Sequence, residues 1–172
     1  MKYNLYNGLS ITLDIPYPQI NNLTQDINLA YHLKKVYSGE TSELTAIHNY
    51  VYQHIIFTNK ELKEVLRKIS VVEMHHLDLL GEMIKKLGLY PTYTYINKKN
   101  NETYWISDVV SYEDDLIKLM KNNIKNEEKA IKNYQKIINC SNNEIVNNVL
   151  ERIILDERQH IEIFTAIMDN LI

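Results

Sequence analysis

The chain has 172 residues, a formal net charge of −3, and only four glycines and three prolines. This length suits a single domain with a substantial core, which we expect to span residues 1–172, and so little glycine and proline favours helices over a turn-rich β fold. The small and mixed charge gives no reason to expect nucleic acid as a partner, and the single cysteine excludes both an internal disulfide and a four-cysteine metal site.

The hydropathy pattern predicts a protein without membrane partners. No segment reaches the roughly 18 consecutive apolar residues that a membrane-spanning helix needs. No charged region followed by an apolar core opens the chain, as it would in a secretory signal. We therefore expect a cytoplasmic protein.

Residues 1–22 alternate polar with apolar side chains and include Pro16 and Pro18, which predicts an extended arm rather than a helix. This arm either wraps the rest of the domain or reaches a neighbouring subunit. Over residues 24–57 the apolar side chains recur at helical spacing. Gly39 interrupts this run and is expected to kink or break it, because glycine costs about 1 kcal/mol relative to alanine inside a helix.

A second helix is predicted to begin at Thr58, which forms a capping box with Glu61, and to stop at Gly88. Residues 89–110 then make a connection that is rich in tyrosine and asparagine. Such a length is unusual inside a compact domain. A crossover that travels from one end of a helical bundle to the other explains it.

Two more capping patterns, Ser111-x-x-Asp114 and Ser141-x-x-Glu144, predict the starts of the third and fourth helices. Apolar residues at helical spacing follow both patterns. Two short turns flanking one long crossover between helices 2 and 3 predict an all-α four-helix bundle of the ferritin-like kind.

Two Glu-x-x-His motifs lie on the predicted second and fourth helices. Glutamate and histidine three residues apart project from one face of a helix, so both can reach the same metal ion. A further glutamate precedes each motif at the same spacing, and the second set of three repeats the first set 84 positions later. The predicted metal ligands are Glu43, Glu73, His76, Glu127, Glu157 and His160.

The charges of this repeat fall on apolar helix faces. Glu127 lies between Ile124 and Ile131 in the apolar stripe of its helix. Burying carboxylates without a counter-charge costs several kcal/mol for each ion. Two divalent cations would balance four carboxylates and leave open positions for water, peroxide or dioxygen. We therefore expect two manganese or two iron ions per chain, and carboxylate and imidazole ligands suit both metals.

Tyr50 and Tyr134 follow Glu43 and Glu127 by two helical turns, on nearly the same face. They are either core aromatic residues that need a partner for the hydroxyl group, or hydrogen-bond donors to the carboxylates across the bundle. We keep both interpretations and count the two tyrosines among the candidate catalytic residues.

These residues resemble a known family. Residues 39–46, followed by Tyr50, resemble the first bundle helix of manganese catalases and related spore-coat catalase-like proteins. The pattern Glu127-x-x-Ala130-x-x-x-Tyr134 resembles their third helix. The repeated Glu-x-x-His is also similar to rubrerythrins and bacterioferritins. The resemblance covers about residues 30–87 and 112–170 and implies a ferritin-like fold.

The resemblance also implies a role for each ligand. Glu43 and Glu127 would be terminal ligands, His76 and His160 nitrogen ligands, and Glu73 a bridge between the two ions. Glu157 corresponds to a bridging ligand in bacterioferritin-like sites and to a proton-handling group in manganese catalases. Two features depart from the relatives: Asn126 stands where manganese catalases can carry arginine, and the four-cysteine iron centre of rubrerythrins is missing.

Three functions follow as hypotheses. The first is disproportionation of hydrogen peroxide, in which Glu157 handles protons, because this reaction needs no outside electron donor. The second is iron binding with ferroxidase activity on dioxygen or peroxide. The third is a structural or coat protein that retains an inherited metal site. The arm and the aromatic crossover are suited to contacts between subunits, so we expect a homo-oligomer.

Overall fold

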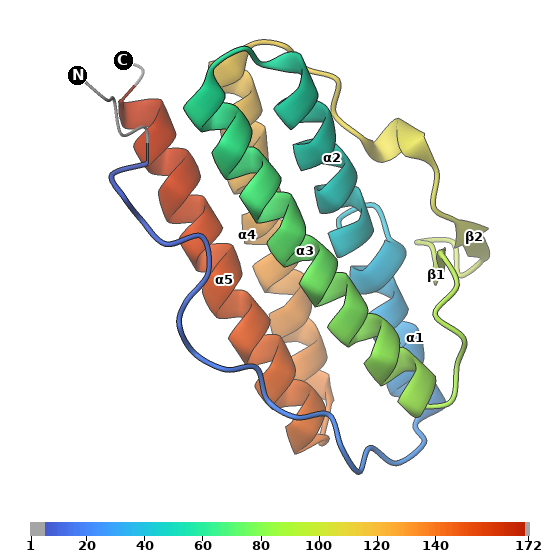
Figure 1. The fold of residues 1–172 in the computed structure, drawn as a ribbon. Coiled ribbons are helices and arrows are strands. Elements are labelled where there is room, and N and C mark those ends of the chain that lie inside the picture. Colours follow the sequence, from blue (N-terminus) through green and yellow to red (C-terminus); the bar gives the residue numbers. More distant parts are fainter. Residues whose placement is uncertain (1–5, 171–172) are drawn as a thin grey trace.

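The computed structural model of the protein describes residues 6–170, so residues 1–5 of the predicted arm and residues 171–172 of the predicted domain lie outside the described range. Within this range, five α-helices form the four rods of a bundle (Figure 1). Their bounds are α1 Ile27–Ser38, α2 Glu43–Ile56, α3 Lys60–Lys86, α4 Leu116–Cys140 and α5 Glu144–Asp169. The predicted all-α bundle is confirmed.

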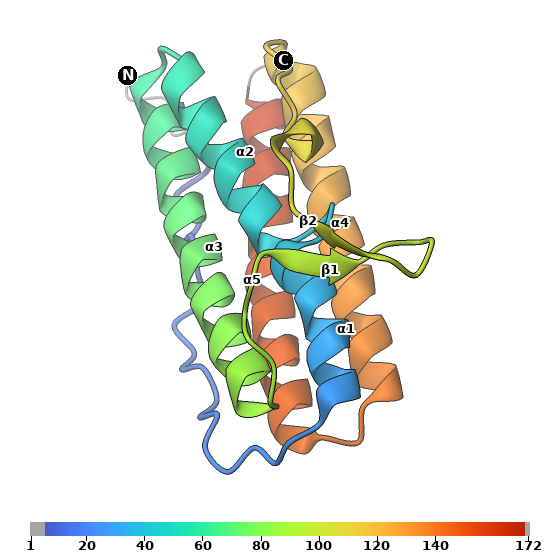
Figure 2. The same ribbon diagram turned by 90° about the vertical axis from the view of Figure 1, so that its right-hand side faces the viewer.

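The first rod is broken where the sequence predicts an interruption. Residues 39–42 separate α1 from α2, and the two helices follow one another along the same edge of the bundle (Figure 2). The Gly39 amide donates to the Lys35 carbonyl at 3.1 Å. A Cβ atom at Gly39 would collide with that carbonyl oxygen, which excludes larger residues from this place. The Ser42 hydroxyl then accepts from the Thr45 amide and caps α2.

The predicted starts of the other three rods are wrong by a few residues. Thr58, Ser111 and Ser141 precede the helices instead of capping them. In each case a later Asn or Asp side chain accepts the capping hydrogen bond, from the backbone amide three residues further on. Asparagine and aspartate cap helices as well as serine does. Where a segment contains serine or threonine as well as asparagine or aspartate, the sequence does not determine which residue caps the helix. The observed caps are Asn59, Asp115 and Asn143.

The end of α3 is confirmed at Gly88. Its φ of 105° is a left-handed conformation that residues with a side chain rarely adopt. The Gly88 amide donates to the Lys85 carbonyl and the Leu89 amide to the Ile84 carbonyl, both at 3.1 Å. These two hydrogen bonds form a Schellman motif, which satisfies carbonyl groups that the helix end leaves free.

The connection between α3 and α4 carries the chain from one end of the bundle to the other (Figures 1 and 2). It runs over residues 87–115, beyond the predicted 89–110, because α4 begins later than expected. An antiparallel hairpin that the sequence did not predict interrupts it, with strands β1 Thr94–Ile96 and β2 Glu102–Tyr104. A short 3-10 helix, η1 Ser107–Val109, follows the hairpin.

Side chains of the first rod hold this crossover. The buried ammonium group of Lys34 donates to the hydroxyl groups of Thr92 and Thr94 at 2.8 and 2.5 Å. Further along, the indole N–H of Trp105 donates to the Thr45 hydroxyl at 2.9 Å. Both contacts fix the crossover against α1 and the start of α2.

Two apolar clusters fill the bundle, one toward each end. One cluster contains Ile69 of α3 and Phe164 of α5. The other contains Leu80 of α3 and Ile153 of α5. The polar residues between these positions therefore form a charged layer across the middle of the core. No helix within residues 6–170 is long and apolar enough to cross a lipid bilayer.

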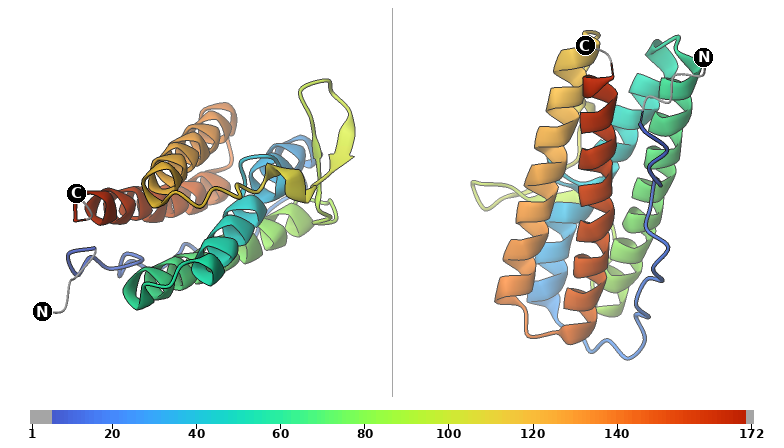
Figure 3. Two further views of the ribbon diagram at one scale, coloured as in Figure 1. Left: turned by 90° about the horizontal axis from the view of Figure 1, so that it is seen from above. Right: turned by 90° about the vertical axis from the view of Figure 1, so that its left-hand side faces the viewer.

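The amino-terminal arm runs lengthwise beside α3 and α5 (Figure 3). Its backbone is held by α5, since the Arg152 guanidinium donates to the carbonyl oxygens of Leu13 and Ile15 at 2.9 and 2.8 Å. The described part of the arm therefore closes the side of the bundle between these two helices.

Candidate metal centre

All six side chains that the repeat predicts as ligands are buried and meet in the charged layer. They form two overlapping groups in which one ligand atom of each residue lies within 4.8 Å of all the others. Both groups contain Glu73 and Glu157. The two groups are Glu43, Glu73, His76 and Glu157, and Glu73, Glu127, Glu157 and His160.

Helical spacing places a histidine beside a glutamate in each Glu-x-x-His motif. The Nδ1 atom of His76 lies 3.0 Å from Glu73 Oε2, and that of His160 lies 3.2 Å from Glu157 Oε2. The same nitrogens also reach across the bundle. His76 Nδ1 is 3.4 Å from Glu157 Oε1, and His160 Nδ1 is 3.0 Å from Glu73 Oε1. Both imidazoles therefore turn Nδ1 toward the carboxylates.

The buried carboxylates of the cluster repel one another and are stabilised by positive charge. Burial and the nearby carboxylate of Glu157 raise the pKa of Glu43 and of Glu127 well above the usual value. Burial would lower the pKa of His160, but the carboxylates of Glu73 and Glu157 raise it to about 10. Without metal, these shifts favour protons on Glu43, Glu127 and His160.

The donor set fits two divalent ions. Glu73 belongs to both groups, and its buried Oε1 atom makes no hydrogen bond of good geometry among the described residues, although His160 Nδ1 lies 3.0 Å away. A buried carboxylate oxygen without a hydrogen bond is costly, and a metal ion would complete its contacts. Four carboxylates and two imidazoles are ligands that manganese and iron both accept.

Metal binding is therefore expected to release protons and to weaken as the pH falls. Ligands bind in deprotonated form, and the raised pKa values of Glu43, Glu127 and His160 keep protons on the metal-free cluster. Calorimetric titrations with Mn²⁺ between about pH 8 and about pH 5, in buffers of different ionisation enthalpy, measure both effects. A variant of the exposed residue beside Glu127, Glu128→Gln, should release the same number of protons. Equal affinity across this range would contradict the expectation.

Tyr50 reaches the cluster from α2. Its buried hydroxyl group donates a hydrogen bond to Glu127 Oε1 across the bundle. Burial and the charge of Glu127 raise the pKa of this hydroxyl, so it stays protonated as a donor. Tyr134 is also buried but packs within the apolar cluster that contains Leu80. The structure thus places only the first of the two predicted tyrosines against a candidate ligand.

Behind His76 lies a carboxylate that the sequence did not single out. Asp156 Oδ2 lies 3.3 Å from His76 Nε2, the nitrogen that faces away from the cluster. The Tyr17 hydroxyl is 3.1 Å from the same nitrogen and also donates to Asp156. Burial opposes the charge of Asp156, but its contacts with His76 and Tyr17 and its ion pair with Arg152 hold its pKa well below the usual range.

Arg152 connects this carboxylate to the arm. Its Nη1 atom lies 2.7 Å from Asp156 Oδ2, and its guanidinium carbon lies 4.3 Å from the centre of the Tyr17 ring. The Thr12 hydroxyl and the Leu13 amide donate to Asp156 Oδ1 at 2.7 and 3.1 Å. The arm therefore takes part in the surroundings of a candidate metal ligand.

One sequence signal points to Asp156, and none points to Tyr17. Asp156 lies one residue before Glu157, and the position that corresponds to it in the repeat is Val72. The exchange of an apolar residue for an acidic one on a buried helix face marks Asp156 as unusual. Tyr17 lies in an irregular segment, where no periodicity predicts which side chain turns inward.

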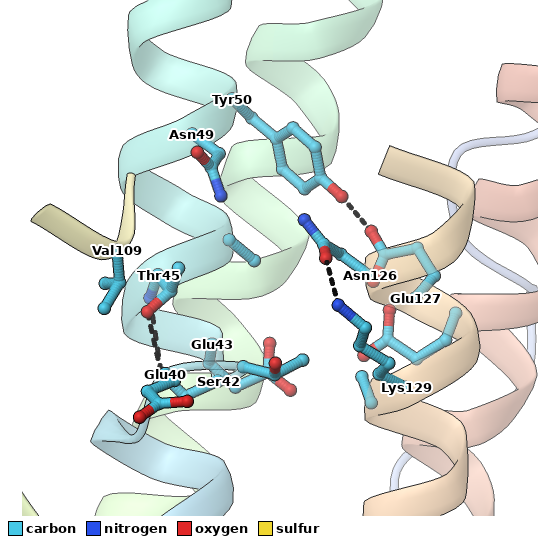
Figure 4. A pocket seen from close by; sticks show the side chains of 14 residues that line it. Glu40, Ser42, Glu43, Thr45, Asn49, Tyr50, Val109, Asn126, Glu127 and Lys129 are labelled. Carbon is cyan, nitrogen blue, oxygen red and sulfur yellow. Dashed lines mark hydrogen bonds between the residues drawn. The ribbon is translucent and has the colours of Figure 1, made fainter. Parts of the chain in front are cut away.

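A pocket leads to the cluster from the side opposite to the arm. It has a volume of about 280 Å³ and lies between α2 and α4 (Figure 4). Three candidate ligands line it, namely Glu43, Glu127 and Glu157. Tyr50 and Glu127 face each other across it in Figure 4. A small molecule can therefore approach the carboxylates from this side.

Polar and charged residues surround the outer part of the pocket. Glu40 and Thr41 come from the break between α1 and α2, and Lys129 comes from α4; the apolar Val109 comes from the crossover. Lys129 Nζ donates to Asn126 Oδ1 at 3.4 Å. This lining favours small polar molecules over bulky apolar ones.

Comparison with known proteins agrees with this geometry. The family model described as ferritin-like domain matches residues 40–172. None of the curated proteins compared matches the chain.

Solved structures give the same fold. The manganese catalase KatB from Anabaena superposes with a TM-score of 0.82 at 22% identity, covering 92% of this chain and 79% of the catalase chain. The bacterioferritin of Desulfovibrio desulfuricans, which has a diiron site, gives 0.69 at 24% identity, covering 84% and 80%. A dodecameric thioferritin from Bacteroides fragilis gives 0.64 at 21% identity, covering 86% and 87%.

Proposed function

The chain belongs to the ferritin-like domain family, and on that premise we propose that it binds two manganese or two iron ions and acts on hydrogen peroxide or dioxygen. The reaction that we propose first is the disproportionation of hydrogen peroxide, as in manganese catalases. One peroxide is oxidised to dioxygen and gives up two electrons and two protons. A second peroxide takes up both and becomes two water molecules.

The observation that carries this proposal is the buried cluster itself. Two four-residue groups share Glu73 and Glu157, and a pocket reaches them from one side. A core that only had to be stable would not bury four carboxylates together. The similarity in fold to a manganese catalase supports the choice of peroxide, and so does the lack of the four cysteines that a rubredoxin-type electron relay needs.

In this proposal Glu43 and His76 would hold one ion and Glu127 and His160 the other, and Glu73, which belongs to both groups, would serve both. Two metal ions held there would supply the exchange of electrons with peroxide. Glu157 lines the pocket and belongs to both groups, so it either contacts both ions or carries protons to and from the substrate.

The proposal gives the two predicted tyrosines different roles. Tyr50 fixes the orientation of Glu127 by donating to one of its carboxylate oxygens. Tyr134 is a core aromatic residue of the neighbouring apolar cluster. Tyr50→Phe should therefore lower turnover more than Tyr134→Phe does.

Metal analysis followed by a peroxide assay tests the function. Protein purified from cells supplied with both metals is expected to carry two manganese ions per chain, measured by elemental mass spectrometry. With both positions filled, it should evolve one dioxygen for every two peroxides consumed. Protein that is filled with manganese and evolves no dioxygen would overturn the proposed reaction.

Ferroxidase activity is the second candidate, favoured by the complete set of four glutamates and two histidines. The diiron bacterioferritin shares the fold. This function would give two irons per chain and rapid oxidation of added ferrous ion by dioxygen or peroxide. It would be excluded if Glu127→Ala oxidised ferrous ion as fast as the unaltered protein does.

The third candidate is a structural protein that retains the metal site. Its support is the exposed aromatic side chains of the crossover, since Tyr90 and Tyr104 are 84% and 75% exposed. Such residues suit contacts between subunits, and we propose a homo-oligomer on this ground. A monomer that turns over peroxide efficiently would exclude the structural role.

A further inference from the structure

The two candidate histidine ligands differ on the side that faces away from the carboxylates. His76 Nε2 lies 3.1 Å from the Tyr17 hydroxyl and 3.3 Å from Asp156 Oδ2. His160 Nε2 is buried and has no hydrogen-bond partner among the described residues. Two imidazoles that are equivalent in the sequence repeat are therefore supported in different ways.

The repeat itself shows why this difference arises. Asp156 lies directly before Glu157, on the helix opposite His76. Its counterpart, directly before Glu73, is Val72, whose side chain has no hydrogen-bonding atom. The arm adds to the difference, because it passes along one side of the bundle only and brings Tyr17 to His76.

We infer that the two metal positions are unequal, and that the position of Glu43 and His76 binds its ion first and more tightly than the position of Glu127 and His160. This inference rests on the proposed dinuclear site and adds an order to it. Tyr17 and Asp156 are positioning residues, because they act on the metal only through His76.

The expected difference in metal affinity comes from the orientation of the histidine rings. A carboxylate or hydroxyl partner behind a ligating imidazole fixes the ring and the tautomer, so that Nδ1 presents its lone pair to the metal. With Asp156 and Tyr17 on Nε2, the ring of His76 is held in that orientation before the ion arrives. His160 has no such partner on Nε2, so its orientation depends on the same carboxylates that would bind the ion. Removing such a partner typically costs about 10–100-fold in metal affinity.

Calorimetric titration of the metal-free full-length chain with Mn²⁺ tests this order. The unaltered protein should bind two ions in separate steps that differ at least about tenfold in affinity. Tyr17→Phe should weaken the tighter step about tenfold, and Asp156→Asn about 10–100-fold, with the weaker step unchanged. Tyr104→Phe, on the exposed crossover, is the matched control and should change neither step.

Ligand variants assign the steps to the positions. His160→Ala should keep the tight step and lose the weak one, whereas His76→Ala should do the reverse. A second readout is the visible absorption of bound Co²⁺, whose band from the tight position should change in Tyr17→Phe and stay the same in Tyr104→Phe. A merely structural role for Tyr17 would lower the thermal midpoint of the metal-free protein and leave the band unchanged.

The measurements distinguish a failure of the inferred binding order from a failure of the proposed reaction. Two ions bound with equal affinity, or an equal loss in both steps on Tyr17→Phe and Asp156→Asn, would overturn the inferred order and leave the metal site in place. A protein that binds two ions in the expected order without evolving dioxygen would overturn the proposed reaction alone. A protein that binds no ions would overturn both.

Discussion

Glu127→Gln is expected to stabilise the metal-free protein and to destroy its function. Glutamine keeps the shape and the oxygen that Tyr50 contacts, but it removes a buried carboxylate that lies near those of Glu73 and Glu157. We expect a gain of about 1–2 kcal/mol in the free energy of unfolding without metal. Peroxide turnover should fall by about a hundredfold or more, because a direct ligand matters at least as much as a residue behind one.

The stability that Glu127→Gln adds to the metal-free protein is expected to depend on pH. The pKa of Glu127 is raised above 4.5 in the folded chain, so the folded state loses stability as the pH rises through and beyond that value. The gain from Glu127→Gln should therefore be small near pH 4.5 and grow toward about pH 8. Urea unfolding of the metal-free protein at several pH values measures it. Glu128→Gln, at the exposed neighbouring position, should change neither stability nor turnover; a metal-free Glu127→Gln protein that is less stable would contradict the expectation.

Arg152→Leu is expected to destabilise the protein by about 3–5 kcal/mol, because it removes the closer of the two cationic partners of the buried Asp156 carboxylate. The same change removes the hydrogen bonds that hold the carbonyl groups of Leu13 and Ile15. For a chain of this length, each kcal/mol lowers the melting temperature by about 2–4 °C. Thermal unfolding measures the loss, and limited proteolysis should cut the arm of the variant first.

A matched control lies on the same helix. Arg158 is exposed, so Arg158→Leu should change the free energy of unfolding by less than about 0.5 kcal/mol. It should also leave the arm as resistant to proteolysis as in the unaltered protein. An Arg152→Leu protein with normal stability and a protected arm would show that the arm is held by other contacts.

The fold was predictable to the extent that its determinants are local and periodic. Apolar spacing places the rods, and Gly39 and Gly88 mark a break and an end where the backbone leaves no room for other residues. The helix starts were less predictable, because Thr58 and Asn59 are both good caps and only the packed structure chooses between them. The hairpin of the crossover was missed because its two strands have three residues each, too few for an alternating pattern.

The candidate site was also predictable only in part. The six ligands share a repeat, so the sequence could predict them as one set, and the structure brings all six together. Tyr17 could not be predicted, because its place at His76 depends on how an irregular arm lies on the bundle. The repeat suggested equal roles for Tyr50 and Tyr134, yet symmetry in sequence does not fix what a hydroxyl group contacts once the two halves pack differently.

The charged layer across the middle of the core has a consequence for the chain as a polymer. Its ligands come from four helices that lie far apart in the sequence, so a bound ion acts as a cross-link that closes several long loops at once. Such closures restrict the unfolded chain, as disulfides do in proteins that have them, and this chain has one cysteine and no disulfide of its own. Each of the two groups takes its residues from three helices, so an ion bound there would join three of the four rods. Removal of the metal is therefore expected to lower the resistance of the whole bundle to unfolding.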